Sequence, residues 1–433
     1  MRRALLVVWL AVLIAGCQAA VPSPMPTPDA WPTPSPTAGG ETPTATPTGA
    51  STGPLVVTLN LWLPEDLSPY GDGPAASLLL QRLDGFRQAY PGLQVQVTVK
   101  RAEGRGGLLD FLRTASAAAP AVLPDLVVLD VDDFRVAAQV GLVQPLDGLL
   151  LDELLADGFP FAGELGQVGG RTMGLPLAVD LEHAAYAPAL VGGMPVSWTA
   201  LLSLSVPFAF PAAGQDGRVA DATLAQYLGA GGRLTDGQGN PQLEAEPLTA
   251  VLDFYARASA AGVVSPTVVL SLADADACWA LLQNGQAGVV MVEAHRFWTE
   301  RLPGVAPAPL PSRDGRPVAL VNGGWLLAVV TSDPQRQQQA MGLMEWLLEP
   351  SFAAAWTEAL GYLPSGRGAL AAWAVTGAER DTLAAILESA RPPLSPSLRE
   401  AVGAPLQVAV ESVLRGRRGP AEAAAAAAQA VGP

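Results

Sequence analysis

A stretch near the middle of the chain, Gly174–Ala187, constrains the fold more than any other segment. Its sequence, GLPLAVDLEHAAYA, begins with turn residues and becomes a short apolar run that is typical of a buried strand. Asp180 and Glu182 stand inside this run, where an ordinary core strand carries no charge. We predict that this strand crosses between two α/β lobes, one built mostly before Pro176 and one after Tyr186, and that the cleft between the lobes is the functional site.

The length and charge of the chain limit the classes of protein to consider. The 433 residues are enough for two ordinary domains and some additional segments. The formal net charge of −15 argues against nucleic-acid binding, because binding to phosphates needs clustered Lys and Arg. The two cysteines, Cys17 and Cys278, indicate no disulfide framework. Cys278 lies in a helical pattern and is predicted to be a buried, small apolar residue.

The start of the chain has the pattern of an export signal. Two arginines precede an apolar segment, Ala4–Ala15, that is too short to span a bilayer comfortably. The segment runs into Ile14-Ala15-Gly16-Cys17, which resembles a bacterial lipobox, so Cys17 is expected to carry lipid once residues 1–16 are removed. The alternative is an ordinary export signal that contains a cysteine by chance. From there to Pro54 the residues are mostly Pro, Thr, Ser, Ala and Gly, which predicts an extended tether without a core.

Strand and helix patterns alternate after the tether. β-Branched and apolar residues predict strands at 55–63, 93–100 and 126–129, and apolar residues at helical spacing predict helices between them and after them. This alternation favours a mainly parallel sheet with helices on its faces.

The residues after the crossing strand are predicted to build the second lobe and then return to the first. A helix through residue 205 begins at Ser197, which is a candidate N-cap. A short strand at 208–211 and a hairpin at 234–243 are expected next. The later pattern predicts helices at 248–261, 275–284, 335–348, 351–360 and 420–431, and strands at 288–292 and 326–330.

Short segments in a fixed order carry a resemblance to a known family. LNLW, FRQAYPGLQVQV, PDLVVLD, GLVQPLDGLL and GRTMGLPLAVDLEHAAYAP are followed by PVSWTALL, GVVMVEAHRFW, NGGWLLAVV and GYLPSGRGAL. Together they resemble the extracellular solute-binding proteins of ABC importers, of the family 1 type that includes many sugar binders. The resemblance implies a two-lobe α/β fold of the periplasmic-binding-protein kind, with discontinuous lobes and a ligand cleft between them. The first lobe is expected at 55–180 and 311–365, and the second at 181–310 and 366–433.

The resemblance also implies ligand contacts at the carboxyl ends of strands, in agreement with the general rule for open α/β sheets. Trp62 and Trp325 are expected to stack on a sugar, with Trp325 the stronger candidate. The alternative for each is an ordinary core tryptophan, and it has more weight for Trp62 than for Trp325. One carboxylate among Asp130, Asp132 and Asp133 is expected to accept a hydrogen bond from a ligand hydroxyl. Asp132 or Asp133 is alternatively suited to cap the next helix.

Further contacts are expected in the crossing strand and beyond it. Asp180 and Glu182 are two residues apart and therefore face the same side of a strand. The segment EAHRFW departs from the family pattern of a small residue, a polar residue and a tryptophan, so Arg296 or Trp298 is expected to meet the ligand with the register open. By resemblance, the loop at Tyr362 supplies another contact.

The resemblance implies a lipid-anchored monomer at the outer face of the cytoplasmic membrane. It would capture a small solute, a carbohydrate by preference, by lobe closure and deliver it to ABC permease subunits. No cofactor or metal is expected, since the DVD sequence at 130–132 has no second acidic cluster beside it. One alternative is an exported hydrolase with Asp180 and Glu182 as paired carboxylates. Against it, HExxH, P-loop and GxGxxG motifs are absent from the sequence, and GxSxG is absent from the residues after the predicted tether. Another alternative is a ligand sensor on the same fold that transports nothing.

Overall fold

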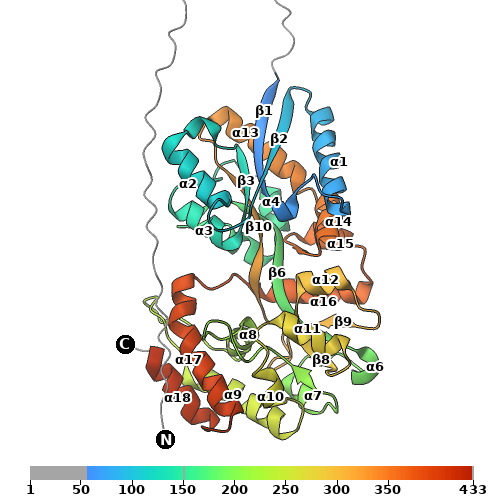
Figure 1. Cartoon of the computed structure of the whole chain (residues 1–433), viewed down its shortest axis with the longest axis vertical. Coiled ribbons are helices and arrows are strands. Elements are labelled where there is room, and N and C mark those ends of the chain that lie inside the picture. The colour runs from blue at the N-terminus through green and yellow to red at the C-terminus, as the bar shows by residue number, and fades with distance from the viewer. Residues whose placement is uncertain (1–55, 150–151, 432–433) are drawn as a thin grey trace, which may run out of the picture. The chain divides into compact units, whose positions relative to one another are not determined.

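A computed structural model describes residues 56–149 and 152–431 of the chain (Figure 1). The predicted export signal, the lipid attachment site at Cys17 and the predicted tether lie outside these residues. The part from Pro54 to Pro433 forms one unit. Within the described residues, no helix combines the length and the apolar character that crossing a bilayer requires.

Three parallel strands begin the described chain. β1 (Val57–Pro64) pairs along its whole length with β2 (Leu93–Lys100) and pairs on its other side with β3 (Leu126–Asp130). The connections contain α1 (Pro74–Ala89) and α2 (Leu108–Ala118), because parallel neighbours need a crossover rather than a tight turn. These predicted strands and helices are confirmed.

Two long strands continue the sheet in the antiparallel sense. β10 (Ala319–Val329) lies between β3 and β6 (Leu175–Tyr186) and is antiparallel to both. The order of the sheet is β2-β1-β3-β10-β6-β8-β7, in which β8 is Val289–Glu293 and β7 is Phe208–Ala209. The prediction of a mainly parallel sheet was therefore wrong for the pairing of β10 with β3 and with β6. The reason is that β10 returns from the second lobe and enters the first lobe from the opposite end, so it runs against β3.

β6 crosses between two parts of the sheet, as the pattern of its residues predicts. Residues up to Leu181 pair with β10, and residues from Glu182 to Tyr186 pair with β8 (Val289–Glu293). β9 (Ala306–Ala308) pairs with the same second half of β6, and β7 (Phe208–Ala209) extends the sheet beyond β8. Figure 1 shows β6 and β10 running together between the two groups of elements. The residue ranges assigned to the two lobes stay a prediction.

Helices cover both faces of the sheet through apolar side chains. In the first lobe, α13 (Pro334–Leu347) and α14 (Pro350–Leu360) pack with α1 around a core that includes Trp356. In the second lobe, α17 (Pro396–Leu414) and α18 (Pro420–Val431) pack against α9 (Ala245–Ala260). Such one-sided apolar stripes are the usual reason that surface helices dock on a sheet.

The other elements are short or lie at the edges, and two of them differ from expectation. The helix after Ser197 ends at Leu202, and the strand predicted at 208–211 has only two residues, Phe208–Ala209. The predicted hairpin at 234–243 reverses the chain with a single antiparallel bridge, and the Asp236 carboxylate accepts hydrogen bonds from the backbone of the turn. The Ser197 cap is confirmed, since its Oγ accepts a hydrogen bond from the Ala200 N–H. The remaining bounds are η1 Glu65–Leu67, η2 Pro120–Val122, α3 Val131–Gln139, α4 Asp152–Asp157, α5 Pro160–Leu165, β4 Gln167–Val168, β5 Arg171–Thr172, α6 Pro188–Val191, α7 Trp198–Leu202, α8 Asp221–Gly229, α10 Pro266–Val269, α11 Ala275–Gln283, α12 Ala294–Glu300, β11 Leu363–Pro364, α15 Arg367–Ala372, α16 Gly377–Ser389 and β12 Ala390–Arg391.

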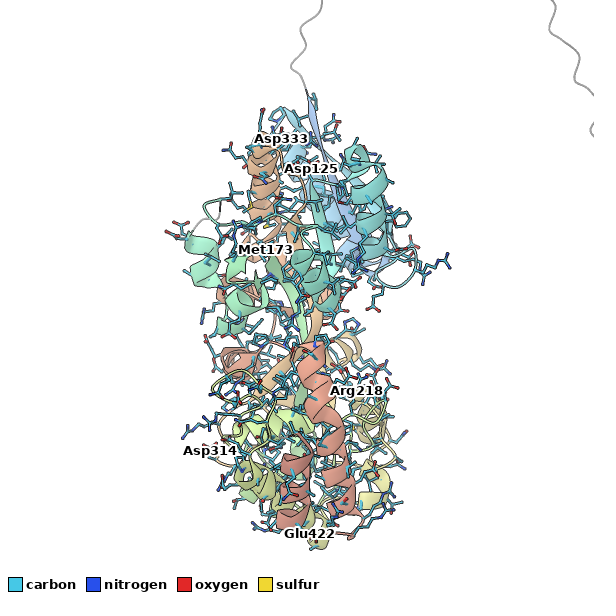
Figure 2. All side chains as sticks on the ribbon, turned by 90° about the vertical axis from the view of Figure 1, so that its left-hand side faces the viewer. Asp125, Met173, Arg218, Asp314, Asp333 and Glu422 are labelled. Atoms are coloured by element: carbon cyan, nitrogen blue, oxygen red, sulfur yellow. The ribbon has the colours of Figure 1, made fainter. Side chains whose placement is uncertain are left out.

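An ion pair fixes α13 to the start of β3 at the end of the first lobe far from the crossing. Asp125, only 2 % exposed, accepts from Arg336 through two bonds, Nε to Oδ1 at 2.6 Å and Nη2 to Oδ2 at 2.5 Å. The Asn60 N–H also donates to Oδ2, at 2.8 Å. Figure 2 shows Asp125 close to Asp333, which caps α13 by accepting from the Arg336 N–H. We call Asp125 with Arg336 the anchor pair.

Candidate functional site

The site is built where β10 departs from regular pairing with β6. The pairing register shifts between Val321 and Gly323 and again between Trp325 and Leu326. Gly324 has a φ of +122°, and a Cβ at this position would lie 2.3 Å from the carbonyl oxygen of Ala178. Glycine is therefore required for the two backbones to approach this closely. Such a bulge redirects the side chains beside it.

A cleft of about 670 Å³ opens beside this bulge. Its walls come from η1, the end of β3 with the start of α3, β6, β10, and the segment that leads into α17. Carboxylates dominate the charged side chains, and two arginines and two aromatic residues accompany them. These lining residues are Asp66, Glu103, Asp130, Asp132, Asp180, Asp221, Glu400, Arg218, Arg399, Trp325 and Tyr362. Figure 2 shows Arg218 beside α17 on the second-lobe side.

A recess of about 290 Å³ adjoins the cleft. The two share four lining residues, Arg218, Asp221, Asn322 and Arg399. The recess adds Glu182 and Glu293 together with residues of the loop before α8 and of the segment that leads into α11. We call this space the acidic recess.

Glu182 and Glu293 stand directly opposite each other in the antiparallel pairing of β6 with β8. The Asn322 amide donates to both Glu293 oxygens, from Nδ2 at 3.1 Å to Oε1 and at 2.9 Å to Oε2. Burial, with the Glu293 charge second, raises the pKa of Glu182 well above its ordinary range. Burial, with the Asp180 charge second, raises the pKa of Glu293 to about 8. The acidic recess therefore holds carboxyl groups that resist ionisation in the absence of a positive partner.

Asp130 and Asp132 both line the cleft. The residue that caps α3 differs from the one that the sequence analysis suggested. The capping residue is Asp130, not Asp132 or Asp133, since Asp130 Oδ1 accepts from the backbone N–H of both, each at 2.9 Å. Asp130 ends β3 in an extended conformation, which is the backbone geometry that an N-cap requires. Its Oδ2 is buried and has no hydrogen-bond partner among the described residues, so it can still accept from a ligand.

Asp180, Trp325 and Tyr362 also line the cleft. Asp180 Oδ1 accepts from the backbone N–H of Leu181 at 2.9 Å and of His295 at 3.0 Å, and burial raises the pKa of Asp180 to about 6. Trp325 is only 6 % exposed, so little of its ring is open to stack on a ligand. The Tyr362 ring stacks on the His295 ring with centroids 4.4 Å apart.

Residues 81–380 match the family described as bacterial extracellular solute-binding protein. The chain belongs to this family. A comparison with curated protein sequences gives no match.

Several solved structures share the fold of this solute-binding protein at low sequence identity. The sugar-binding protein MalE from Xanthomonas citri has a TM-score of 0.66 at 20 % identity, with 87 % of this chain and 96 % of that chain covered. A cyclic alpha-maltosyl-1,6-maltose binding protein from Arthrobacter globiformis has a TM-score of 0.65 at 18 % identity, covering 87 % and 98 %. A solute-binding protein of an ABC transporter from Thermotoga lettingae, bound with alpha-D-tagatose, has a TM-score of 0.59 at 20 % identity, covering 86 % and 98 %. The predicted family and fold class are confirmed.

Three residues that the sequence analysis proposed as ligand contacts do not line the cleft of this solute-binding protein. Trp62 is buried on β1 and faces Lys100, whose Nζ lies 4.5 Å from the centre of the indole. Arg296 forms an ion pair with Glu300, with Nε 3.0 Å from Oε1. Trp298 is buried and packs edge-on against another tryptophan of the core. Contact of these three residues with a ligand stays an untested prediction.

Several site residues of the solute-binding protein were missed by the sequence analysis. Glu293 and Asn322 follow or begin recognised strands, and their polar character beside apolar runs was a usable signal. Arg218, Asp221 and Arg399 gave no such signal, because they lie in an irregular segment or in the first turn of a helix and reach the site only through the tertiary fold.

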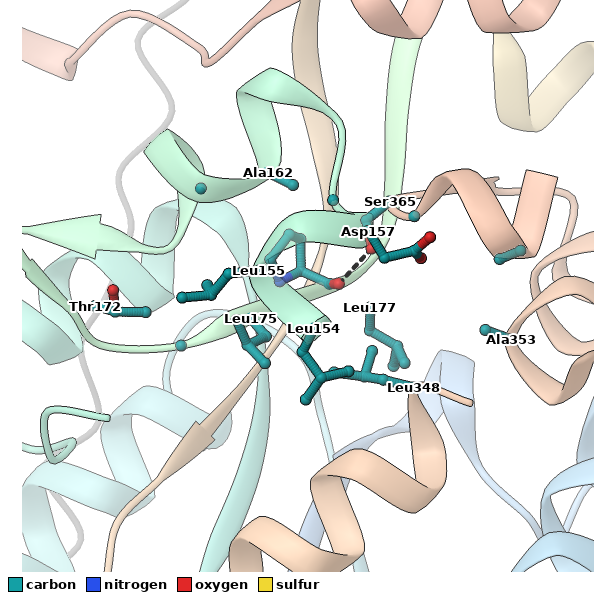
Figure 3. A pocket seen from close by; sticks show the side chains of 16 residues that line it. Leu154, Leu155, Asp157, Ala162, Thr172, Leu175, Leu177, Leu348, Ala353 and Ser365 are labelled. Carbon is teal, nitrogen blue, oxygen red and sulfur yellow. Dashed lines mark hydrogen bonds between the residues drawn. The ribbon is translucent and has the colours of Figure 1, made fainter. Parts of the chain in front are cut away.

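A second pocket of the solute-binding protein lies inside the first lobe and shares no lining residue with the cleft (Figure 3). Leu154, Leu177 and Leu348 contribute apolar walls, and Ser365 Oγ donates a hydrogen bond of 2.5 Å to the Pro176 carbonyl oxygen. Its volume of about 60 Å³ suits a few water molecules rather than a solute. The cleft is therefore the better candidate of these two for solute binding.

The sequence analysis also predicted a buried Cys278 and no metal site. Cys278 is fully buried in α11, as predicted, and burial raises the pKa of its thiol. Among residues 56–149 and 152–431, no group of three or more His, Cys, Asp or Glu side chains is placed to hold a metal ion.

Proposed function

We propose that this protein captures a small carbohydrate in the cleft and delivers it to the permease subunits of an ABC importer. The observation that supports this proposal is the cleft beside the β10 bulge, with its carboxylates, its amide and its two aromatic side chains. Oxygen acceptors in this number suit a ligand that carries many hydroxyl donors, and the two aromatic side chains suit the apolar part of a sugar ring. The similar solved proteins named for maltose or bound with tagatose agree with this choice.

Lobe closure is the proposed mechanism of capture. Asp130 and Asp132 lie on the first-lobe wall, and Arg218, Asp221 and Arg399 lie on the second-lobe wall. A ligand that touches both walls favours the form in which they are close, because only that form makes all the contacts. β6 and β10 join the lobes, and we propose that bending at the β10 bulge allows closure as a hinge.

The location follows from the family, whose members act outside the cytoplasm. We further propose that lipid on Cys17 holds the protein at the outer face of the cytoplasmic membrane, with the Pro-rich and Thr-rich residues up to Pro54 as a tether. We propose that it acts as a monomer that binds its solute without converting it. A change of Cys17 to Ala is expected to abolish labelling by radioactive palmitate and to release the protein into the medium. Unchanged labelling would contradict the anchor.

The proposal for the solute is tested by thermal shift of the full chain with neutral sugars, polyols, amino acids and peptides. A bound sugar raises the melting temperature by mass action. Calorimetry on the best sugar would then compare Asp180→Asn and Trp325→Phe with the parent chain. We expect each change to weaken binding about tenfold, because each removes one buried hydrogen bond to the ligand. Tyr70→Ala, which removes an exposed aromatic side chain that does not line the cleft, is the control.

Two results would contradict the proposed function. One is a shift by amino acids or peptides but by no sugar. The other is hydrolysis of a glycoside by the purified chain, with loss of turnover in Asp180→Asn, which would favour the exported hydrolase.

A further inference from the structure

More acidic than basic side chains line the acidic recess. Carboxylates lining it are Glu182, Asp216, Asp221, Asp274 and Glu293, and the arginines are Arg218 and Arg399. Arg399 donates to the Asp221 carboxylate, so one positive group is already engaged. Arg218 is exposed, and the structure records no ion pair for it among the described residues. The Arg399 charge still acts on Glu182, but among the described residues no basic side chain forms an ion pair with either glutamate of the opposed pair.

Like charges directly opposite each other on neighbouring strands destabilise the pairing. Glu182 and Glu293 occupy such positions on β6 and β8, and a sheet that only had to be stable would place an apolar pair there. The neighbouring pairs of the same ladder, from His183 with Val292 to Tyr186 with Val289, are mostly apolar. The two glutamates therefore have a role that outweighs their cost to the sheet.

The orientation of the Asn322 amide leaves acceptor atoms, rather than donors, without partners in the acidic recess. Its Nδ2 faces Glu293 and donates to both oxygens of that side chain. The Oδ1 atom is consequently turned away from Glu293, and it is buried without a donor among the described residues. Glu182 Oε2 is likewise buried without a donor. Two unsatisfied acceptors and the Glu293 carboxylate thus line one space.

We propose that the acidic recess binds a protonated amine of the solute. An ammonium group carries three N–H donors and no acceptor, and it supplies the positive charge that the two glutamates lack. A neutral hydroxyl donates only one hydrogen bond and leaves that charge uncompensated. Glu182, Glu293 and the Asn322 carbonyl are the three acceptors.

The neighbouring cleft indicates what the amine is attached to. Trp325, only 6 % exposed, has an Nε1–H that lies near the Tyr362 hydroxyl but makes no hydrogen bond of good geometry among the described residues, and Asn322 lies three residues before it on β10. Asp130 has a free acceptor in the same cleft. A body with hydroxyl groups satisfies both, so the solute class is an amino sugar. This inference rests on the proposed carbohydrate function and narrows it.

The test compares pairs of probes that differ only in replacing a hydroxyl by an amine. Glucosamine is compared with glucose, and the β-1,4-linked glucosamine trimer with cellotriose, by calorimetry on the full chain. Spermidine serves as an amine without a sugar body. We expect at least one amine to bind about tenfold more tightly than its hydroxyl counterpart, as one added charge-assisted contact warrants.

The variants Glu182→Gln and Glu293→Gln keep the shape of the recess and remove its charge. We expect either one to reduce the ratio of the two affinities to about threefold or less, since an amide holds an ammonium group more weakly than a carboxylate does. Glu422→Gln is the matched control, because it removes the same charge from an exposed residue of α18 at the far end of the second lobe (Figure 2). Melting curves confirm that each variant is folded.

Each outcome decides between the two proposals. Equal or tighter binding of the hydroxyl probe, or a ratio that survives both glutamine variants, overturns the amine subsite and leaves the carbohydrate function standing. Binding of spermidine without binding of any sugar supports the amine subsite and contradicts the carbohydrate function. Failure of every probe contradicts both. If a variant does not fold, the ratio measured on the parent chain decides by itself.

Discussion

The anchor pair and the acidic recess are two buried sets of charged side chains that are satisfied to different degrees. Asp125 accepts from the Arg336 guanidinium through both oxygens and also from a backbone N–H. Glu182 and Glu293 face each other, and one oxygen of Glu182 has no donor among the described residues. The first set carries a complete hydrogen-bond arrangement of its own. The second set is complete only when something else supplies donors and positive charge.

This difference separates carboxylates that hold the fold from carboxylates that are reserved for a ligand. A buried charge without a partner costs free energy, so it persists where function requires it. The anchor pair lies at the end of the first lobe far from the crossing, and the recess lies beside the crossing itself. Breaking the first set is therefore expected to destabilise the protein, whereas neutralising the second set is expected to stabilise it.

The largest effect is expected from Asp125→Asn. The change removes a paired buried charge and leaves the Arg336 guanidinium without its partner. We expect the free energy of unfolding to fall by about 2–4 kcal/mol, at the lower part of the range for buried pairs because Arg336 is partly exposed. Urea denaturation measures the change. Asp253→Asn, which breaks an exposed pair with Arg257, is the control and should change stability by less than about 0.5 kcal/mol. An equal loss of stability in both variants would show that the anchor pair contributes no more to stability than an exposed ion pair.

Gly324→Ala tests whether the backbone beside the acidic recess is held as tightly as the anchor pair. A methyl group there meets the Ala178 carbonyl oxygen at a φ that side chains rarely adopt. We expect a loss of about 2–3 kcal/mol together with loss of solute binding, because the bulge shapes the cleft. Gly342→Ala in α13, where a Cβ meets nothing within 4 Å, is expected to stabilise the protein by about 0.5–1 kcal/mol. Unimpaired binding in Gly324→Ala would show that the bulge does not set the site.

Glu293→Gln should have the opposite sign to Asp125→Asn and should depend on pH. The pKa of Glu293 is raised from 4.5 to about 8 by burial first and by Asp180 second. Between these values the unfolded chain has already lost this proton while the folded chain keeps it, so rising pH lowers the free energy of unfolding. Glutamine removes this loss. Since one pH unit of difference in pKa corresponds to about 1.4 kcal/mol, we expect a gain of roughly 1–3 kcal/mol at pH 8.

The gain from Glu293→Gln should nearly vanish at pH 5, and thermal unfolding at the two pH values measures it. Asn322 can still donate to the side-chain carbonyl oxygen of the introduced glutamine, so the change in stability is attributable to the charge. A destabilised variant at pH 8 would contradict this prediction, because it would mean that interactions in the folded protein stabilise the charged Glu293 carboxylate.

The smallest effect is the coupling energy between the two members of each set. For Glu182 and Glu293, changed singly and together to Gln, we expect an unfavourable coupling of about 1 kcal/mol, because either change relieves the repulsion. For Asp125 and Arg336, changed to Asn and Gln, the coupling should be favourable. Double-mutant cycles at pH 8 measure both signs. If the two cycles gave couplings of the same sign, the contrast between the anchor pair and the acidic recess would be wrong.

The elements whose periodicity is local were predictable from the sequence. The strand at 93–100 has the predicted bounds, and a helix at 108–118 follows it as predicted, because alternation with period two and apolar spacing with period 3.6 are properties of neighbouring residues. The crossing strand was also predictable, since a charged pair inside an apolar run is visible without knowing its partners. In the site, the cleft gathers five predicted residues, Asp130, Asp132, Asp180, Trp325 and Tyr362.

Only the tertiary structure decided which segments are neighbours. Three features of the fold join residues from separate elements that are far apart in the sequence. They are the insertion of β10 between β3 and β6, the pairing of Glu182 with Glu293, and the position of Arg399 at the cleft. Periodicity fixes the face on which a side chain lies but not the strand that comes to lie beside it. Register and lobe geometry arise from packing over the whole core, and the unsatisfied acceptors of the acidic recess exist only once that packing is in place.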